Sequence, residues 1–278
     1  MAASATRDHR GTEITRPQIA LCQRGIFSPI DRSSRKSMLF ALVDKKKTRA
    51  FPSGRAICPN CDKELLAKTG EIVTWHWSHF ADHDCDPWNE GESEWHLGWK
   101  TKATEDRCEV IMGNHRADIV SLCGHVIELQ HSSLIPEQVR KREEHYGKMV
   151  WMIDGSEFRD RLEFWKHDTH WTFKWSHVRK WMLEIHKPMI WDLGTVLGSD
   201  DLFVVKKLYP NTPGENAVFV DGKFSYSEGS RRAGGWGRFV SRKEFDLWAF
   251  GPMADGKIVR QLSLFPEPEV VHIPPWYL

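Results

Sequence analysis

The stretch RADIVSLCGHVIELQHS, residues 116–132, constrains the fold most, because it indicates two short strands around a turn at residues 123 and 124. Asp118, Glu128 and Gln130 interrupt its apolar runs. Side chains alternate along a strand, so Glu128 and Gln130 share one face about 6.8 Å apart. Asp118, on the partner strand, is expected opposite Leu129 or Gln130. Buried carboxylates need a cation or a hydrogen-bond donor, and Mg²⁺ prefers carboxylate oxygens. The stretch therefore predicts a magnesium site at Asp118 and Glu128; the alternative is edge-of-sheet charges paired with Arg116 or Lys141.

The neighbouring segments predict a particular order of elements. Residues 92–107 are rich in helix formers, and CEVIM, residues 108–112, is a short apolar strand that precedes the two strands of the hairpin. Residues 132–147 indicate a helix with Pro136 in its first turn and Gly147 after its end. MVWMID, residues 149–154, is a continuous apolar run that suits a buried strand. The predicted order is helix, three strands, helix, strand.

The first of these helices carries two stripes. Trp95, Trp99 and Ala103 recur at a spacing of four residues and predict a buried face. A second stripe at the same spacing contains the polar residues Glu92, His96 and Lys100, and Glu94 lies off it. A histidine on a helix is commonly structural or solvated, and the spacing of His96 from Lys100 is what makes a catalytic role the alternative.

A group of metal-ligating residues precedes the helix. Cys58 and Cys61 form a CxxC pair, and His79, His83 and Cys85 follow it. A structural zinc site takes four nitrogen or sulfur ligands, commonly two from a CxxC turn and two from a later segment. The favoured set is Cys58, Cys61, His79 and Cys85, with His83 as the alternate fourth ligand. A redox CxxC is the competing interpretation, but no strand-to-helix pattern surrounds this pair.

Composition narrows the classes of protein to which the chain could belong. The net charge of +1 gives no global nucleic-acid signal, so any basic surface must be local. The polar N-terminus has no apolar signal segment, and MLFALV, residues 38–43, is too short to span a bilayer. We therefore expect a soluble cytoplasmic protein. The run RKRE, residues 140–143, is expected on a solvated helix face, and the Trp-rich residues 171–182 are expected in a core.

Several of these motifs together resemble a known family. CPNC, HFA, SEWHLGWK, RADIV, IELQHS and MVWMID are similar to segments of the competence protein CoiA-like nucleases, over about residues 55–155. The resemblance implies a mixed α+β or α/β fold with a PD-(D/E)XK restriction-endonuclease-like core, αβββαβ. It also implies a zinc-binding, β-rich segment before the core and an α+β region after it.

The resemblance further implies roles for individual residues. Asp118 and Glu128 would bind Mg²⁺ or Mn²⁺, and Gln130 would stand where the wider superfamily has lysine. Glu94 would be the acid of the helix, with Glu92 as the alternate. His96 and Lys100 would contact phosphate or tune the site. The family's HFAH is broken here, because position 82 is Asp and the next histidine is His83.

The function implied is a Mg²⁺-dependent deoxyribonuclease acting in DNA uptake, recombination or defence. The alternatives are a catalytically inactive zinc protein that binds nucleic acid, and a ribonuclease. The expected partners are DNA and a protein that loads the enzyme on DNA. The predicted organisation is a flexible N-terminus at 1–18, strands and the zinc knuckle at 19–91, the nuclease core at 92–155, an α+β region at 156–265 and a Pro-rich tail at 266–278.

Overall fold

A computed structural model of the chain describes residues 37–71, 74–80, 85–86, 88, 92–210, 218–220, 223–225 and 232–251. All of them belong to the compact unit Ser34–Leu278. The described part has a mixed α/β fold that is rich in strands and has three α-helices, as the sequence predicts at this coarse level. The predicted flexible N-terminus and Pro-rich tail lie outside the described residues. None of the described helices is both long and apolar enough to cross a membrane.

The first sheet is antiparallel and holds six short strands in the order β1-β6-β5-β4-β2-β3. Its core contains Leu65 and Trp77, both fully buried, and the Trp77 indole donates a hydrogen bond to the Thr48 carbonyl at 2.9 Å. Short strands bury little area each, so a large aromatic residue at the centre supplies much of the apolar contact. The strands are β1 (Ser37–Met38), β2 (Phe40–Val43), β3 (Lys46–Arg49), β4 (Arg55–Ile57), β5 (Glu64–Lys68) and β6 (His76–His79).

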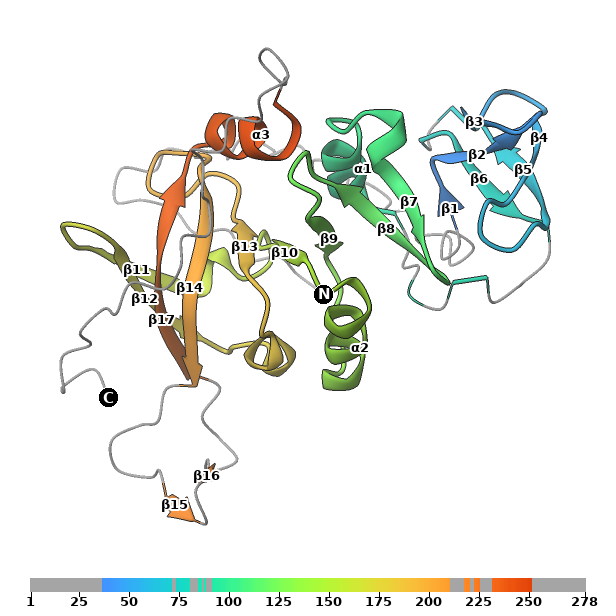
Figure 1. The fold of residues 1–278 in the computed structure, drawn as a ribbon. Helices are drawn as coiled ribbons and strands as arrows, with labels where there is room; N and C mark the ends of the chain where they lie inside the picture. The colour runs from blue at the N-terminus through green and yellow to red at the C-terminus, as the bar shows by residue number, and fades with distance from the viewer. Residues whose placement is uncertain are drawn as a thin grey trace, which may run out of the picture. The chain divides into compact units, whose positions relative to one another are not determined.

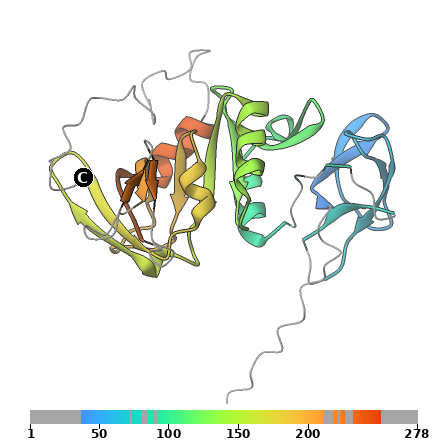
Figure 2. The same ribbon diagram turned by 90° about the horizontal axis from the view of Figure 1, so that it is seen from below.

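The second sheet has nine strands in the order β11-β12-β17-β14-β13-β10-β9-β8-β7. Its centre is parallel, because β10 pairs in parallel with both β9 and β13, and the other pairs are antiparallel. Figure 1 and Figure 2 show the strands side by side, from the yellow β11–β12 hairpin to the green β7–β8 hairpin. The strands are β7 (Cys108–Met112), β8 (His115–Val120), β9 (Val126–Gln130), β10 (Met149–Asp154), β11 (Leu162–Lys166), β12 (Trp171–Ser176), β13 (Met189–Asp192), β14 (Leu202–Pro210) and β17 (Arg232–Val240).

This sheet is continuous across residue 155, so the predicted boundary between residues 155 and 156 falls inside one sheet. A separate two-stranded sheet pairs β15 (Val218–Val220) with β16 (Lys223–Ser225).

Helices cover both faces of the nine-stranded sheet. Trp151 and Ile153 of β10 belong to the same core cluster as Val139 of α2 (Pro136–Tyr146). The intervening Val150 and Met152 pack in a second cluster with Trp99 of α1 (Glu94–Lys100) and with Phe245 and Trp248 of α3 (Arg242–Phe250). Residues that alternate along a strand point to opposite faces. Burial on both faces explains why MVWMID is apolar throughout.

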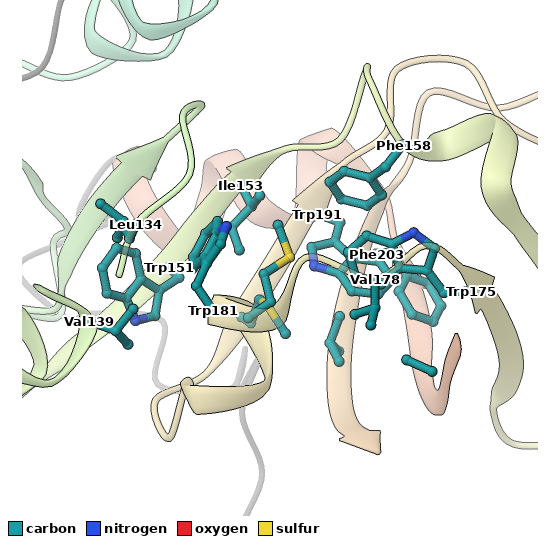
Figure 3. Close-up of a cluster of buried hydrophobic side chains, with 14 of the residues drawn as sticks. Leu134, Val139, Trp151, Ile153, Phe158, Trp175, Val178, Trp181, Trp191 and Phe203 are labelled. Carbon is teal, nitrogen blue, oxygen red and sulfur yellow. The ribbon is translucent and has the colours of Figure 1, made fainter. Parts of the chain in front are cut away.

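Tryptophans from the C-terminal half complete the first cluster. Trp175, Trp181 and Trp191 are each at most 4% exposed, and Figure 3 shows them beside Phe158 and Phe203. The Phe158 and Trp175 rings stack with centroids 4.6 Å apart. The prediction that the Trp-rich residues 171–182 pack in a core is therefore confirmed for Trp175 and Trp181.

The helix predicted at 92–107 is shorter in the structure. It begins after the N-cap Ser93 and ends at Lys100, where the Lys102 N–H donates to the Trp99 carbonyl and the Ala103 N–H to the Lys100 carbonyl. Bonds of this i to i+3 kind tighten and end a helix. A separate 3₁₀ turn, Glu105–Arg107, follows. The second predicted helix is confirmed, with Pro136 in its first turn and Gly147 at its C-cap with a φ of +60°.

One buried carboxylate holds both α1 and α3 against the nine-stranded sheet. Asp192, at the end of β13, accepts hydrogen bonds from the indoles of Trp95 and Trp99 at 2.9 and 3.0 Å. Its other oxygen pairs with Arg242 of α3 at 2.5 Å. Asp192 is 6% exposed, so these donors replace the water that its charge has lost. The carboxylate thereby holds α1, and with it His96 and Lys100, against the sheet.

Replacing Asp192 with alanine should lower the free energy of unfolding by about 3 kcal/mol, because Arg242 and two buried indoles lose their acceptor. Asp200 is the matched control, since it pairs with the same arginine at 3.1 Å but is 66% exposed. Asp200→Ala should cost less than about 1 kcal/mol. Urea denaturation of both variants measures this, and equal losses would contradict the anchoring role.

Candidate functional site

A buried lysine ammonium forms the centre of the site. Lys100 is 1% exposed, and its Nζ lies 2.5 Å from Glu92, 2.9 Å from Asp118 and 3.2 Å from Glu109. Burial opposes the charged amine, but the three carboxylates outweigh it and raise the pKa of Lys100 well above its ordinary value. The ammonium therefore stays charged, and it binds together three segments that the sequence separates.

Glu109 is the first partner that sequence reasoning missed. Cys108 and Val110 pair with Ile119 and Ala117, so the register places Glu109 opposite Asp118. Two acidic residues facing each other on neighbouring strands repel unless a cation lies between them, and Lys100 provides that cation. The other Glu109 oxygen accepts from the backbone N–H groups of Leu39 and Phe40 at 2.9 and 3.1 Å. CEVIM is an apolar run with one acid, so no local pattern indicates that Glu109 has partners about seventy positions away.

Asp118 has a donor on each oxygen. Its Oδ1 pairs with Lys100, and its Oδ2 accepts from the Leu129 N–H at 2.9 Å. This contact agrees with the predicted position of Asp118 near Leu129, although the strand register of Ile119 with Ile127 places residue 118 across from 128. Burial opposes ionisation of Asp118, but Lys100 and His96 hold the pKa of this carboxyl below its ordinary value. A carboxylate offers about four lone-pair sites, so both oxygens can still accept another ligand.

Glu128 is less well satisfied. It is 6% exposed, and its Oε1 accepts from the Arg142 side chain at 3.3 Å. Its Oε2 is buried and has no hydrogen-bond partner among the described residues. Burial and then the charge of Asp118 raise the pKa of Glu128 to about 8. A buried acceptor without a donor is costly, so Glu128 is held where a further cation or donor would stabilise it.

A small polar cavity opens between the carboxylates. Its volume is about 30 Å³, which is room for one water molecule or one ion. Carboxylate oxygens on two adjacent strands are the ligand type that hard divalent cations prefer, so Asp118 and Glu128 fit Mg²⁺ or Mn²⁺. The lining residues are Asp86, Trp88, Glu92, His96, Arg116, Asp118, Glu128, Leu129, Gln130 and Arg142.

Two of the three residues of the predicted polar stripe face this cavity. Glu92 and His96 line it, and burial raises the pKa of Glu92 to about 7. Burial also lowers the pKa of His96 to about 4, so its imidazole is neutral at physiological pH. The His96 Nδ1 accepts from the Ser93 N–H at 3.3 Å, which leaves the proton on Nε2.

The structure places some of the predicted site residues together and others apart from them. The structure brings His96, Lys100, Asp118, Glu128 and Gln130 together, and Gln130 is 2% exposed. The Gln130 amide donates to the Ser132 carbonyl at 2.9 Å. Glu94 is exposed at the start of α1 and does not line the cavity, whereas the alternate acid Glu92 does line it.

The run RKRE divides between surface and interior. Arg140 and Lys141 are exposed and lie near Glu144 and Glu137 one turn away. Arg142 and Glu143 are buried, so the expectation of a wholly solvated face is wrong for them. Arg142 reaches Glu128, while Glu143 accepts hydrogen bonds from the Trp151 indole and the backbone N–H groups of residues 186 and 187.

Asp86 is a second residue that sequence reasoning missed. Its oxygens accept from the Arg116 N–H at 2.9 Å and the Trp88 N–H at 3.0 Å, and its Oδ1 lies 2.9 Å from His115 Nδ1. Trp88 stacks on His115, and its carbonyl accepts from Arg142 at 3.1 Å. The only sequence signal is adjacency, because Asp86 directly follows the candidate zinc ligand Cys85.

The four favoured zinc ligands come together. One ligand atom from each of Cys58, Cys61, His79 and Cys85 lies within 4.8 Å of all the others. Cys58 Sγ lies 3.5 Å from Cys85 Sγ, and Cys61 Sγ lies 3.3 Å from His79 Nε2. Zinc–sulfur bonds of about 2.3 Å in a tetrahedron separate sulfurs by a little under 4 Å, so the group could bind a metal such as zinc. The alternate ligand His83 lies outside the described residues.

Lys100→Met should lower the free energy of unfolding by about 3–5 kcal/mol, because three carboxylates lose the buried cation that they share. The matched control is Lys141→Met, whose lysine is 56% exposed and pairs with Glu137 on the same helix. The control should cost no more than about 0.5 kcal/mol. Urea denaturation measures both values, and a similarly small loss for Lys100→Met would show that the carboxylates do not depend on it.

The purified protein should contain one zinc ion, measured by inductively coupled plasma mass spectrometry. Cys58→Ser and Cys85→Ser should reduce the zinc content below half, because each removes a thiolate ligand. Cys123→Ser is the control, since Cys123 is not part of the cluster, and it should keep its zinc. Zinc retained by both ligand variants would refute the assignment.

One family model matches part of the chain. Residues 42–87 match the family model described as Competence protein CoiA, N-terminal domain. No curated protein and no solved structure matches the chain. The matched segment contains the four residues of the Cys₃His cluster and also Asp86, and the carboxylate cavity draws its other lining residues from beyond it. The match supports the predicted resemblance to CoiA proteins over residues 42–87.

Proposed function

We propose that the protein is a metal-dependent nuclease that hydrolyses phosphodiester bonds of DNA. The observation that carries this proposal is the buried Oε2 of Glu128, which lacks a donor among the described residues and lies beside a cavity for one ion that Asp118 also lines. A protein that only binds a polyanion has no need of paired carboxylates in a cavity that faces its ligand. The family match at residues 42–87 is consistent with a role in competence, such as DNA uptake or recombination.

The order of elements supports a PD-(D/E)XK core. Helix α1 is followed by β7, β8 and β9, then by α2 and β10, with one short 3₁₀ turn before β7. Asp118 lies on the second of the three strands and Glu128 on the third. We assign Gln130, two residues after Glu128, to the position where the superfamily has lysine, although an amide cannot supply positive charge.

Asp118 and Glu128 would hold a divalent cation such as Mg²⁺, which lowers the pKa of a bound water and polarises a phosphoryl oxygen. Arg142 orients the Glu128 carboxylate, and Lys100 orients that of Asp118. Lys100 is almost fully buried, so we assign it as a positioning residue that acts through Asp118. Glu92 is assigned as the acid of the helix, in place of Glu94.

In the proposed reaction, the oxygen of a water molecule bonds to phosphorus while the bond from phosphorus to the 3′ oxygen breaks. The water releases one proton, and the departing 3′ oxygen takes one up, so one water is consumed and no oxidant or reductant is needed. The neutral His96 lines the cavity and can donate a hydrogen bond through Nε2. Donors preorganised at the reacting phosphate stabilise its developing charge.

The Cys₃His cluster is assigned as a structural zinc site that supports the carboxylate cavity. Cys85 is a ligand, and the next residue, Asp86, lines the cavity and accepts from the Arg116 N–H. A metal that fixes Cys85 therefore also fixes Asp86.

A catalytically inactive nucleic-acid-binding protein is the second candidate. It is favoured by the hydrogen bonding of Asp118, because each of its two oxygens already has one donor, Lys100 or Leu129.

Cleavage of labelled single- and double-stranded DNA with Mg²⁺ or Mn²⁺ separates the two candidates. Asp118→Asn and Glu128→Gln should each lower the cleavage rate by about 100-fold or more, because each removes a charged ligand while keeping the side-chain shape. Circular dichroism and zinc content should match wild type. Failure of the wild type to cut any DNA, with binding intact, would favour the inactive protein, and cleavage of RNA alone would identify a ribonuclease.

The same assay distinguishes the two candidate acids of the helix. Glu92→Gln should lower the rate of cleavage, because Glu92 lines the cavity and pairs with Lys100. Glu94→Gln makes the same substitution two residues away on an exposed side chain, and its rate should equal that of wild type. The reverse order of effects would restore Glu94 to the site.

A further inference from the structure

The carboxylate cavity is too small for any organic part of a substrate. At about 30 Å³ it takes an ion or a water molecule, so the nucleotides on either side of the reacting phosphate must lie elsewhere on the protein. A much larger groove, of about 950 Å³, begins at Ser133, three residues after Gln130. Arg179 lines this groove and donates to the carbonyl of His131, the residue that follows Gln130, at 3.3 Å. The groove is thus joined to the segment that leaves the candidate site.

The groove has a basic wall. Arg161, Arg179 and Lys180 line it against a single carboxylate, that of Glu184. Arg161 and Lys180 are exposed and have no ion pair among the described residues, whereas Arg179 pairs with Glu157. Unpaired cations near a proposed phosphodiester site would be stabilised by phosphate groups. The chain as a whole carries a net charge of only +1, so this local excess of positive charge indicates a site for an anionic ligand.

Besides these charged residues and the polar Ser133 and His177, the groove has an apolar part. Ile135 is 58% exposed and lies next to Pro136 on the rim. Leu134, Val178 and Trp181 also line the groove, and they are buried side chains of the core cluster drawn in Figure 3. A duplex directs its bases inward and presents phosphates outward, which leaves an apolar wall without a partner. An unpaired strand offers both phosphates and the exposed faces of its bases.

We infer that this groove binds a single strand of nucleic acid next to the reacting phosphate, with Arg161 and Lys180 on its phosphates and Ile135 against its bases. The inference deepens the proposed function and rests on it for the class of ligand. It makes single-stranded DNA, or a locally unpaired end, the preferred substrate.

The test is fluorescence anisotropy with a labelled oligothymidylate and a duplex of equal length. No divalent cation is added, so that metal-dependent cleavage does not occur, and no chelator is added, so that the Cys₃His cluster keeps its metal. The double variant Arg161→Glu/Lys180→Glu should bind the single strand at least about tenfold more weakly than wild type. Its plot of log affinity against log salt should be flatter by about 1.4, for two lost phosphate contacts on a single strand.

Lys46→Glu/Lys68→Glu is the control, because it makes the same charge change at exposed positions of the first sheet, and it should bind like wild type. Ile135→Ser should weaken binding without changing the salt slope, since it removes no charge. Equal binding by the groove variant and wild type would overturn the inference, as would equal weakening in the control. Wild-type affinity for the duplex equal to or above that for the single strand would also overturn it. So would displacement of the strand by an oligoglutamate of equal charge, which would identify a groove for any polyanion.

The failure of this inference is distinguishable from failure of the proposed function. A wild type that cuts no nucleic acid with Mg²⁺ or Mn²⁺ could still bind the single strand through the groove. That result would support the groove as a binding site and overturn the proposed nuclease activity. Cleavage by wild type together with unchanged binding and cleavage in the groove variant overturns the groove alone.

Discussion

The structure depends on one buried ammonium group. Lys100 joins Glu92, Glu109 and Asp118, which come from the segment before α1 and from two neighbouring strands. A buried charge is tolerated only when its partners satisfy it, so these contacts fix the position of α1 against β7 and β8. Glu109 extends the network to the first sheet, because its second oxygen accepts from two backbone N–H groups at residues 39 and 40. Asp192 holds the same helix through its two tryptophans.

The third carboxylate of this region, that of Glu128, has fewer hydrogen-bond donors than the others. Extending the ladder registers places Glu109, Asp118 and Glu128 in a row across β7, β8 and β9, and Lys100 neutralises only the first two. Arg142 reaches one oxygen of Glu128, and the other stays buried without a donor among the described residues. Proteins break the rule that buried polar groups are satisfied mainly where function requires it. The third carboxylate is therefore the place where a bound cation would contribute most.

Local patterns in the sequence predicted the elements well, because they depend on nearby residues. The order of helix, three strands, helix and strand is observed, and Pro136 and Gly147 mark the ends of α2 as expected. The Cys₃His group was also predictable, since zinc ligands follow a characteristic spacing. The first helix was predicted too long, because helix formers continue past the i to i+3 bonds that end it at Lys100.

The residues that contact the site residues could not be predicted from local sequence patterns. Glu109 lies in an apolar run, and Asp86 is one acid among several, so neither carries a local signal. Their roles arise from contacts made across the sheets, such as Glu109 with Leu39 and Asp86 with Arg116. Arg142 was assigned to the surface with its neighbours because its helix face depends on the packing of α2. Hydrophobic periodicity does not indicate which charges are buried in pairs.

If Asp118 and Glu128 together bind a divalent cation, calorimetric titration of Mn²⁺ should detect the binding. The titration uses protein whose Cys₃His cluster is already loaded with zinc, with wild type beside Glu128→Gln. We expect one Mn²⁺ site in the wild type and none in the variant, while zinc content and thermal unfolding stay the same. A wild type that binds no Mn²⁺, or a variant that binds it equally well, would contradict the account.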